Sequence, residues 1–283
     1  MLVDADTKLI GRFHYENNGT GLNIYNPYFE DMGVNTAYLL FVNEAKPLVE
    51  GMRKLGLCGA VTAGFEHSAE LLDLVDEVSE SAKLARRIGV IANRNGVLSA
   101  HYQGGEGLLG AVLEKIDIKE KKIVIVGAGA VAKSFILALS QNVSRPSSVV
   151  IVNRTAENAA TLVDEFDFIE SVRSLDSLAD QKGDILINAS RIGSKIPDEL
   201  FNADIIRGYQ AVADVSFGNP ETNFITTARQ NGIVSIDGWD MFTYQAAVVL
   251  RFCINHNADI QRLRRFVRTG LANSNHGAKL GNE

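Results

Sequence analysis

The sequence predicts an α/β protein built from two lobes, and three observations carry this prediction. Short apolar runs alternate with amphipathic segments along most of the 283 residues, as strands alternate with helices. One apolar run, KIVIV, leads through a glycine-rich turn into a helical segment. In addition, 46% of the residues are hydrophobic and 22% are charged, so a chain of this length has enough apolar surface for two cores.

The first lobe is expected to alternate strands and helices up to a charged segment, DIKEKK, which is the expected domain boundary. Two of its helices are predicted to stop at glycines, Gly56 and Gly89, because glycine is common just after a helix. The expected elements are strands at 36–42, 57–63 and 97–102, and helices at 45–56, 76–89 and 105–116.

The second lobe is expected to hold a parallel sheet, because its strand-like runs are apolar on both faces, as in sheets covered by helices on both sides. The expected elements are a strand, turn and helix at 122–140, strands at 147–155, 184–190, 210–217 and 233–237, and helices at 156–166 and 222–232.

A long apolar helix is predicted at 240–256 and is expected to return to the first lobe. The first domain is then 1–117 with 240–270, the second is 118–239, and 271–283 is a tail. The arginines of the segment 261–270 are expected to form a solvated helix end rather than an anion site.

The charge and the cysteines exclude several classes of function. A net charge of −6 gives no general attraction to nucleic acid or to an anionic membrane. Cys58 and Cys253 lie far apart in apolar contexts, which predicts two buried thiols, and no structural metal is expected. The N-terminus has no signal pattern and no apolar run is long enough to span a membrane, so we expect a cytoplasmic protein. We expect it to act on a small molecule as a monomer or homodimer.

The turn GAGAVAKS follows a strand and opens a helix, which is typical of a dinucleotide site. Gly127 would give the turn its tight geometry, and Gly129 would let the backbone approach a pyrophosphate. The helix start at Ala130 and Val131 would then offer N–H groups and the positive end of the helix dipole to phosphate. A turn with only a structural role is the alternative.

The end of the next strand indicates which dinucleotide would bind. Proteins that bind NAD usually place an Asp or Glu there, whereas this strand ends in Asn153, Arg154 and Thr155. Asn153 can bond the ribose edge, Arg154 can bind a 2′-phosphate and stack on adenine, and Thr155 can add a hydroxyl. The sequence therefore predicts NADP as the cofactor, with an ordinary helix start as the alternative.

With these motifs the chain resembles the shikimate dehydrogenase family over nearly its whole length. The segments DEVSESAKLARRIG, INAS, DVSFGNPET and GWDMFTYQAA are similar to family motifs. The resemblance implies a substrate-binding α/β domain and a Rossmann-like NADP-binding domain, with the C-terminal helix packed back on the first. It also implies cofactor contacts at Ala189, Ser190, Gly238 and Met241, and a substrate contact at Phe217, where the family has Tyr.

At both catalytic positions of the family this chain differs. The family's NVTxPxK falls on AVTAGFE, so Glu66 stands in place of the catalytic Lys. NTDxxG falls on YQGGEG, so Gly104 stands in place of the catalytic Asp, preceded by Tyr102 and Gln103. In the family, that Lys–Asp pair handles the hydroxyl proton while hydride moves to the nicotinamide.

Several substrate-binding positions differ as well. Two serines that hold the shikimate carboxylate in the family become Gly19 and Gly21, and an Asn becomes Ala92. Thr62 and Gln245 match the family's substrate ligands. Because each unpaired polar group costs about 1–3 kcal/mol, the resemblance implies little affinity for shikimate.

Tyr102 and Glu66 are the candidate proton donors. A phenol can donate a proton, and so can a carboxyl group of raised pKa. Glu66 either lies in the cleft facing the nicotinamide or, with His67 and Ser68, forms the polar start of a helix, and the family alignment favours the cleft. His101 is expected to point away from Tyr102, because side chains alternate along a strand.

Three functions are consistent with this pattern. The favoured one is an NADP-dependent oxidoreductase of the shikimate dehydrogenase type that reduces a carbonyl or imine of a small molecule other than shikimate, or runs the reverse reaction. The alternatives are a non-catalytic NADP-binding sensor or partner protein, and a residual shikimate or quinate dehydrogenase. The cofactor half shows no comparable loss of residues, which favours the first.

Overall fold

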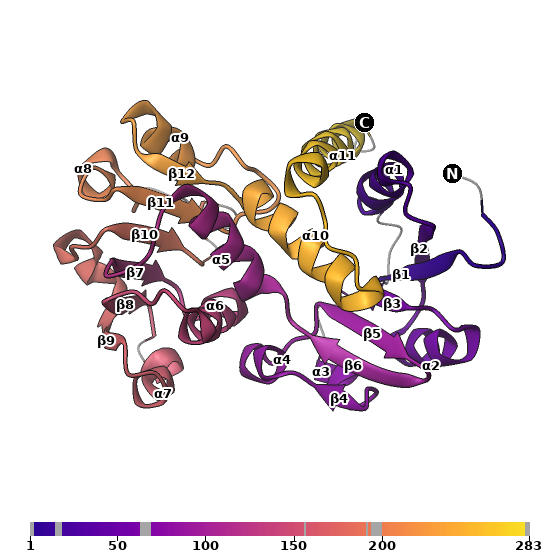
Figure 1. The fold of residues 1–283 in the computed structure, drawn as a ribbon. Helices are drawn as coiled ribbons and strands as arrows, with labels where there is room; N and C mark the ends of the chain where they lie inside the picture. Colours follow the sequence, from indigo (N-terminus) through magenta and orange to yellow (C-terminus); the bar gives the residue numbers. More distant parts are fainter. Residues whose placement is uncertain are drawn as a thin grey trace. The chain divides into compact units, whose positions relative to one another are not determined.

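The computed structural model describes residues 3–14, 19–62, 69–155, 157–190, 192–193 and 200–280. The chain forms two compact units, each an α/β structure with its own sheet (Figure 1). The first unit comprises Met1–Gln103 and Gln245–Glu283, and the second comprises Gly104–Tyr244. The first boundary lies earlier in the chain than the boundary after residue 117 that the sequence suggests.

The boundary lies earlier because helix α5 (Gly104–Lys115) packs on α6 (Ala130–Gln141) of the second unit. At Gly105 the two backbones are so close that a Cβ would lie 2.1 Å from the carbonyl carbon of Ser134. Only glycine fits such an approach.

The sheet of the second unit is parallel throughout its described strands and has the order β12-β11-β10-β7-β8-β9. From β7 the chain adds β8 and then β9 on one side. It then returns to the other side of β7 and adds β10, β11 and β12. The strands are β7 (Lys122–Val126), β8 (Ser148–Asn153), β9 (Ile169–Ser174), β10 (Ile185–Asn188), β11 (Ala211–Asp214) and β12 (Val234–Ile236).

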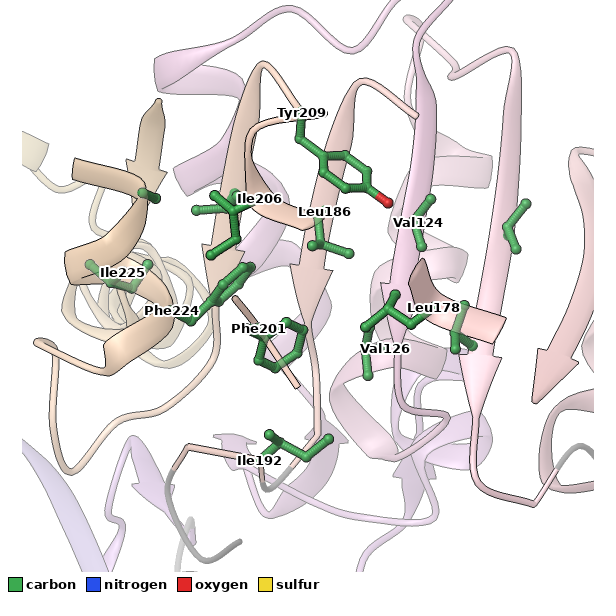
Figure 2. Packing of buried hydrophobic residues seen from close by; sticks show 14 residues of the cluster. Val124, Val126, Leu178, Leu186, Ile192, Phe201, Ile206, Tyr209, Phe224 and Ile225 are labelled. Carbon is green, nitrogen blue, oxygen red and sulfur yellow. The ribbon is translucent and has the colours of Figure 1, made fainter. Parts of the chain in front are cut away.

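Helices cover both faces of this sheet, as its doubly apolar strands predict. Val124 and Val126 of β7 belong to a buried cluster that also contains Phe201, Ile206 and Phe224 (Figure 2), while Ile123 and Ile125 alternate with them and are also fully buried. Besides α5 and α6, the unit contains α7 (Glu157–Glu165), the 3₁₀ helix η1 (Leu175–Asp180), α8 (Ala203–Ile206) and α9 (Asn223–Gln230).

The sheet of the first unit is mixed, with the order β2-β1-β3-β5-β6-β4. Strand β5 is antiparallel to both of its neighbours, β3 and β6. The strands are β1 (Lys8–His14), β2 (Thr36–Val42), β3 (Gly59–Val61), β4 (Glu77–Val78), β5 (Val90–Arg94) and β6 (Val97–His101).

The prediction of a helix at 76–89 is wrong at both ends, because the helix begins later and ends earlier. Its first residues form β4, which pairs with Ser99 and Ala100 of β6. The hydroxyl of Ser79 accepts a hydrogen bond from the Ala82 N–H at 3.3 Å and caps α4 (Glu80–Ala85). The helix ends at Arg86, which adopts a left-handed conformation with φ 49°, so Gly89 is not its stop.

The C-terminal segment returns to the first unit, which confirms that prediction. Helix α10 (Gly238–Ile254) crosses the unit boundary, and α11 (Ile260–Leu280) packs on α1 (Leu22–Met32). The two lie side by side in Figure 1, and a Cβ at Gly270 of α11 would lie 2.5 Å from Ile24 Cγ1. The tail expected from residue 271 is wrong, because the helix continues to Leu280. The remaining helices of the unit are α2 (Ala45–Leu55) and α3 (Ala69–Leu72).

Candidate functional site

The predicted cofactor residues of the second unit follow the carboxyl ends of its strands. Ligands of open α/β sheets bind at this edge, where the strand order reverses, and here that point lies between β7 and β10. Gly127, Gly129, Ala130 and Val131 follow β7, Asn153, Arg154 and Thr155 end or follow β8, Ala189 and Ser190 follow β10, and Gly238 and Met241 follow β12.

Gly127 brings the ends of β7 and β10 together. It has φ 106°, a left-handed value that side chains disfavour, and a Cβ there would lie 2.8 Å from the carbonyl oxygen of Ala189. Its N–H also donates to the Val152 carbonyl of β8 at 2.8 Å. The turn is thus fixed at the reversal point, with Gly127 on one side and Ala189 on the other.

Gly129 is the N-cap of α6 and leaves the start of this helix open. No side chain caps the helix, and a Cβ at Gly129 would have no atom within 4 Å among the described residues. Ala130 and Val131 begin the helix and are half-buried. A helix start with unsatisfied N–H groups and a clear approach fits a dinucleotide pyrophosphate.

The end of β8 presents a cation, a hydroxyl and an amide. Arg154 and Thr155 are exposed, and Arg154 forms no ion pair with a described residue. The Asn153 side-chain amide donates to the Thr155 carbonyl at 2.7 Å, which fixes the turn and leaves its carbonyl oxygen as an acceptor. No carboxylate follows the strand directly, so the position suits a 2′-phosphate.

Ser190 and Asn188 fix the loop after β10. The Ser190 hydroxyl donates to Asn188 Oδ1 at 2.6 Å and accepts from the Ile192 N–H at 3.1 Å. Asn188 in turn donates to the Ile192 carbonyl at 2.8 Å. The hydroxyl and the N–H of Ser190 are therefore both used within the loop, and its carbonyl is what this position can offer to a cofactor.

Asp214 lies at the end of β11 and was not singled out from the sequence. Its carboxylate accepts hydrogen bonds from Thr222 Oγ1 at 2.7 Å, from the Ser216 N–H at 2.9 Å and from Asn188 Nδ2 at 3.3 Å. Burial raises its pKa, although these hydrogen bonds act in the opposite direction. A polar residue that ends an apolar strand, eight positions before a Thr, was the available signal.

The start of α10 is held by Asp237, whose Oδ1 accepts from the N–H groups of Trp239 and Asp240 at 3.0 and 2.9 Å. Gly238 lies against the loop after β11, since a Cβ would be 2.1 Å from the Ser216 carbonyl oxygen. Met241 is buried one turn further along. Position 238 therefore requires glycine for packing.

Phe217 is 44% exposed, which leaves its ring available to a ligand. The ring packs on Phe242 with centroids 4.9 Å apart, and its carbonyl accepts from Trp239 Nε1 at 3.0 Å. These contacts set the position of a side chain that lacks the hydroxyl of the tyrosine found in the family.

In the first unit, the ends of three adjacent strands bring Thr62 and Tyr102 into one row. Val61 of β3 pairs with Val90 of β5, and Val90 pairs with His101 of β6. One residue further on, Thr62 donates its N–H to the Gly89 carbonyl at 2.9 Å, and Gly89 donates to the His101 carbonyl at 3.0 Å. Thr62 is fully buried, with its hydroxyl donated to the Ile88 carbonyl at 3.0 Å.

Tyr102 is half-buried at the end of β6, and burial raises the pKa of its phenol. The preceding His101 lies elsewhere, with its Nδ1 3.1 Å from the hydroxyls of both Ser79 and Ser81 and its ring against Phe252 of α10. With a pKa above the ordinary 10.0, the phenol of Tyr102 is protonated at neutral pH, as a proton donor must be.

Two predicted site residues stand apart from this row. Glu66, together with His67, lies outside the described residues. Gln245 is half-buried on α10, where the chain re-enters the first unit. Among the described residues, the structure therefore groups Thr62 with Tyr102.

The described part of the chain contains neither a cluster of metal-ligating side chains nor a disulfide. No three His, Cys, Asp or Glu side chains gather there to hold a metal ion. Cys253 is buried as predicted, whereas Cys58 is half-buried, and both thiols are free. None of the described helices is long and apolar enough to cross a membrane.

Comparisons with known proteins agree with this architecture. A family model described as shikimate / quinate 5-dehydrogenase matches residues 111–204. A relative named shikimate dehydrogenase (NADP(+)), from Geobacillus sp. (strain WCH70), is 32% identical over 259 residues, which cover 86% of this chain and 91% of the relative.

Solved structures show the same fold. A shikimate dehydrogenase in complex with NADP+ has a TM-score of 0.81 at 26% identity, covering 95% of this chain and 98% of its own. A ligand-free 5-ketofructose reductase of Gluconobacter sp. strain CHM43 has a TM-score of 0.77 at 23% identity, covering 94% and 99%, which is a likeness of fold. The chain therefore belongs to the shikimate dehydrogenase family.

Proposed function

We propose that this protein is an NADP-dependent oxidoreductase that acts on a small molecule other than shikimate, by reducing a carbonyl or an imine or by the reverse reaction. The observation that carries the proposal is a contrast between the two units. The second unit has a glycine turn and helix start that fit a dinucleotide. In the first unit, Thr62 and Tyr102 share a row. Position 104, where the family has its catalytic Asp, is a buried glycine at the start of α5.

NADP fits the second unit, and the matched Geobacillus relative is named as NADP(+)-dependent. When bound, it would supply the hydride of the reaction. We assign the pyrophosphate to the start of α6 at Gly129, Ala130 and Val131, and the 2′-phosphate to Arg154 and Thr155 beside Asn153. The assignments to the nicotinamide half are Ala189, Ser190, Gly238 and Met241.

We assign the proton to Tyr102, because its phenol is protonated at neutral pH and the residue lies in one row with Thr62 at the strand ends. Thr62 would orient the substrate as an acceptor, since its hydroxyl proton is used on Ile88. Gln245 would contribute an amide, and Phe217 an apolar surface without a hydroxyl. Glu66, placed from the sequence alone, is the second candidate proton donor.

The family's fold accommodates reductases of different names. The 5-ketofructose reductase that shares the fold is one example, although at 23% identity the likeness concerns the fold alone. Hydride transfer to a carbonyl or imine requires a bound cofactor, a held substrate and one proton donor. A chain without the family's catalytic Lys–Asp pair can therefore still catalyse such a reduction.

Turnover assays test the proposal. Purified protein and NADPH are incubated with a panel of ketones and imines, and NADP+ is offered with shikimate and with quinate. We expect NADPH oxidation with members of the panel, lowered by Tyr102→Phe, and no NADPH formation with shikimate. No turnover across the panel would favour a non-catalytic NADP-binding protein, and NADPH formation that depends on shikimate would restore a shikimate dehydrogenase.

A further inference from the structure

The side chain of Gln103 carries a buried oxygen that has no hydrogen-bond partner. Gln103 follows Tyr102 at the end of β6 and is only 6% exposed. Its Oε1 is inaccessible and accepts no hydrogen bond from a described residue. An unpaired buried acceptor lowers stability, so its presence calls for a cause other than packing.

The position of this amide is set by Gly89. A Cβ at residue 89 would lie 1.9 Å from Gln103 Oε1 and 2.8 Å from its Cδ, so the absence of a side chain on Gly89 makes the space that the amide fills. Gly89 is also the residue whose carbonyl accepts from the Thr62 N–H. The amide thus lies against Gly89, the residue just before β5 that stands between Thr62 and Tyr102 in the row.

We propose that Gln103 determines specificity, with Oε1 accepting a hydrogen bond from a hydroxyl or amine of the substrate. The inference deepens the proposed function and rests on it for the identity of the site. Buried polar groups that a ligand completes discriminate strongly against analogues that lack the matching group. The substrate class is therefore a carbonyl or imine compound that carries a further O–H or N–H donor.

The first test needs no substrate. Gln103→Met has a similar volume and no unpaired acceptor, so it should hold the Tm of the unliganded protein or raise it by about 2–6 °C. A lower Tm would show that the amide stabilises the fold, and would overturn the proposal.

The second test measures binding without turnover. Protein saturated with NADP+ cannot reduce a ketone, and NADPH formation is monitored to exclude oxidation of the ligand hydroxyls. Calorimetry then compares cyclohexanone with 4-hydroxycyclohexanone, and acetone with hydroxyacetone. The unmodified protein should bind the hydroxylated member of at least one pair about tenfold more tightly or better, and Gln103→Met should lose this preference. Ser171→Ala, which removes another buried unpaired hydroxyl on β9, should keep it. Absence of a preference in the unmodified protein, or its survival in Gln103→Met, would overturn the proposal.

The two proposals fail in different ways. If NADPH is never oxidised but the hydroxyl preference and its loss in Gln103→Met are observed, the oxidoreductase proposal alone fails. If ketones are reduced with equal kcat and KM in both proteins, the inference on Gln103 alone fails.

Discussion

The phenol ring of Tyr38 occupies the space that a side chain at Gly21 would need. A Cβ on Gly21 would lie 2.6 Å from Tyr38 Cε1 and 2.8 Å from its hydroxyl oxygen. The Tyr38 ring is buried and stacked on Tyr25 with centroids 4.6 Å apart. A serine at position 21, which the family uses for the substrate carboxylate, would therefore require a packed ring to move.

Gly21→Ser should lower the free energy of unfolding by about 1–3 kcal/mol, because it overpacks a filled site. Gly19→Ser is the matched control, because among the described residues its Cβ would meet only Leu22 Cδ1, at an ordinary contact distance of 3.5 Å. It should change stability by less than about 0.5 kcal/mol. Urea unfolding measures both. Equal stability of the two variants would contradict the packing argument.

Gly127→Ala and Gly129→Ala should separate stability from cofactor binding. Alanine at 127 meets the Ala189 carbonyl oxygen and an unfavourable φ, so it should lower the Tm. Alanine at 129 has an extended backbone and meets none of the described residues within 4 Å, so it should keep the Tm and weaken NADPH binding by obstructing the helix start. An unchanged NADPH affinity in Gly129→Ala would remove the pyrophosphate from this turn.

Arg154→Ala should weaken NADPH binding about 10–100-fold, or roughly 1.4–2.8 kcal/mol, and leave NADH binding unchanged, because only NADPH carries the 2′-phosphate. Arg207→Ala is the control, since this exposed arginine pairs with Asp204 on α8 and has no assigned role. Calorimetric titration with both cofactors gives the comparison. Equal losses for NADPH and NADH would place the phosphate elsewhere.

Tyr102→Phe should lower kcat for reduction by about 10²–10⁴-fold with a smaller change in KM, because it removes the proposed proton donor. Burial raises the phenol pKa above its ordinary value of 10.0, so Tyr102 stays protonated below that pH. The pH–rate profile should therefore show no loss of rate from this group between about pH 7 and 10. A basic limb within that range that disappears in Tyr102→Phe would be incompatible with the assignment.

Stability should fall on mild acidification, in part through His256. Its Nε2 lies 3.1 Å from the Tyr28 hydroxyl, and burial lowers its pKa below the ordinary 6.5. The folded state then binds fewer protons than the unfolded state, so this contribution is complete above pH 6.5 and is lost as pH falls through the lower folded pKa. Thermal unfolding across this range should show a shallower decline in His256→Gln than in the unmodified protein. Parallel declines would assign the pH dependence to other groups.

The sequence allowed the second unit to be predicted in more detail than the first. The four residues after Lys122, IVIV, are all apolar, which is typical of a strand covered on both faces, and all four are buried in β7. In the first unit, β5 was missed although Asn95 and Gly96 carry the typical two-residue hairpin signal. Both have left-handed φ, 55° and 89°, and they join β5 to β6.

The polar contacts of the site depend on strand register, which the sequence does not encode locally. Asn188 meets Asp214 because β10 and β11 pair at these two residues, 26 positions apart. Strand pairing also brings Gln103 against Gly89, because the pairing of β5 with β6 places Gly89 beside the end of β6. By contrast, the NADP residues follow one strand end after another, so local motifs were enough to predict their grouping.

One measurement tests the central claim most directly: calorimetric titration of the unmodified protein with NADPH and with NADH, each with and without shikimate. We predict tight binding of NADPH, weaker binding of NADH and no effect of shikimate on either. Absence of nucleotide binding would contradict the cofactor site, and shikimate binding that strengthens that of the nucleotide would contradict a redirected substrate site.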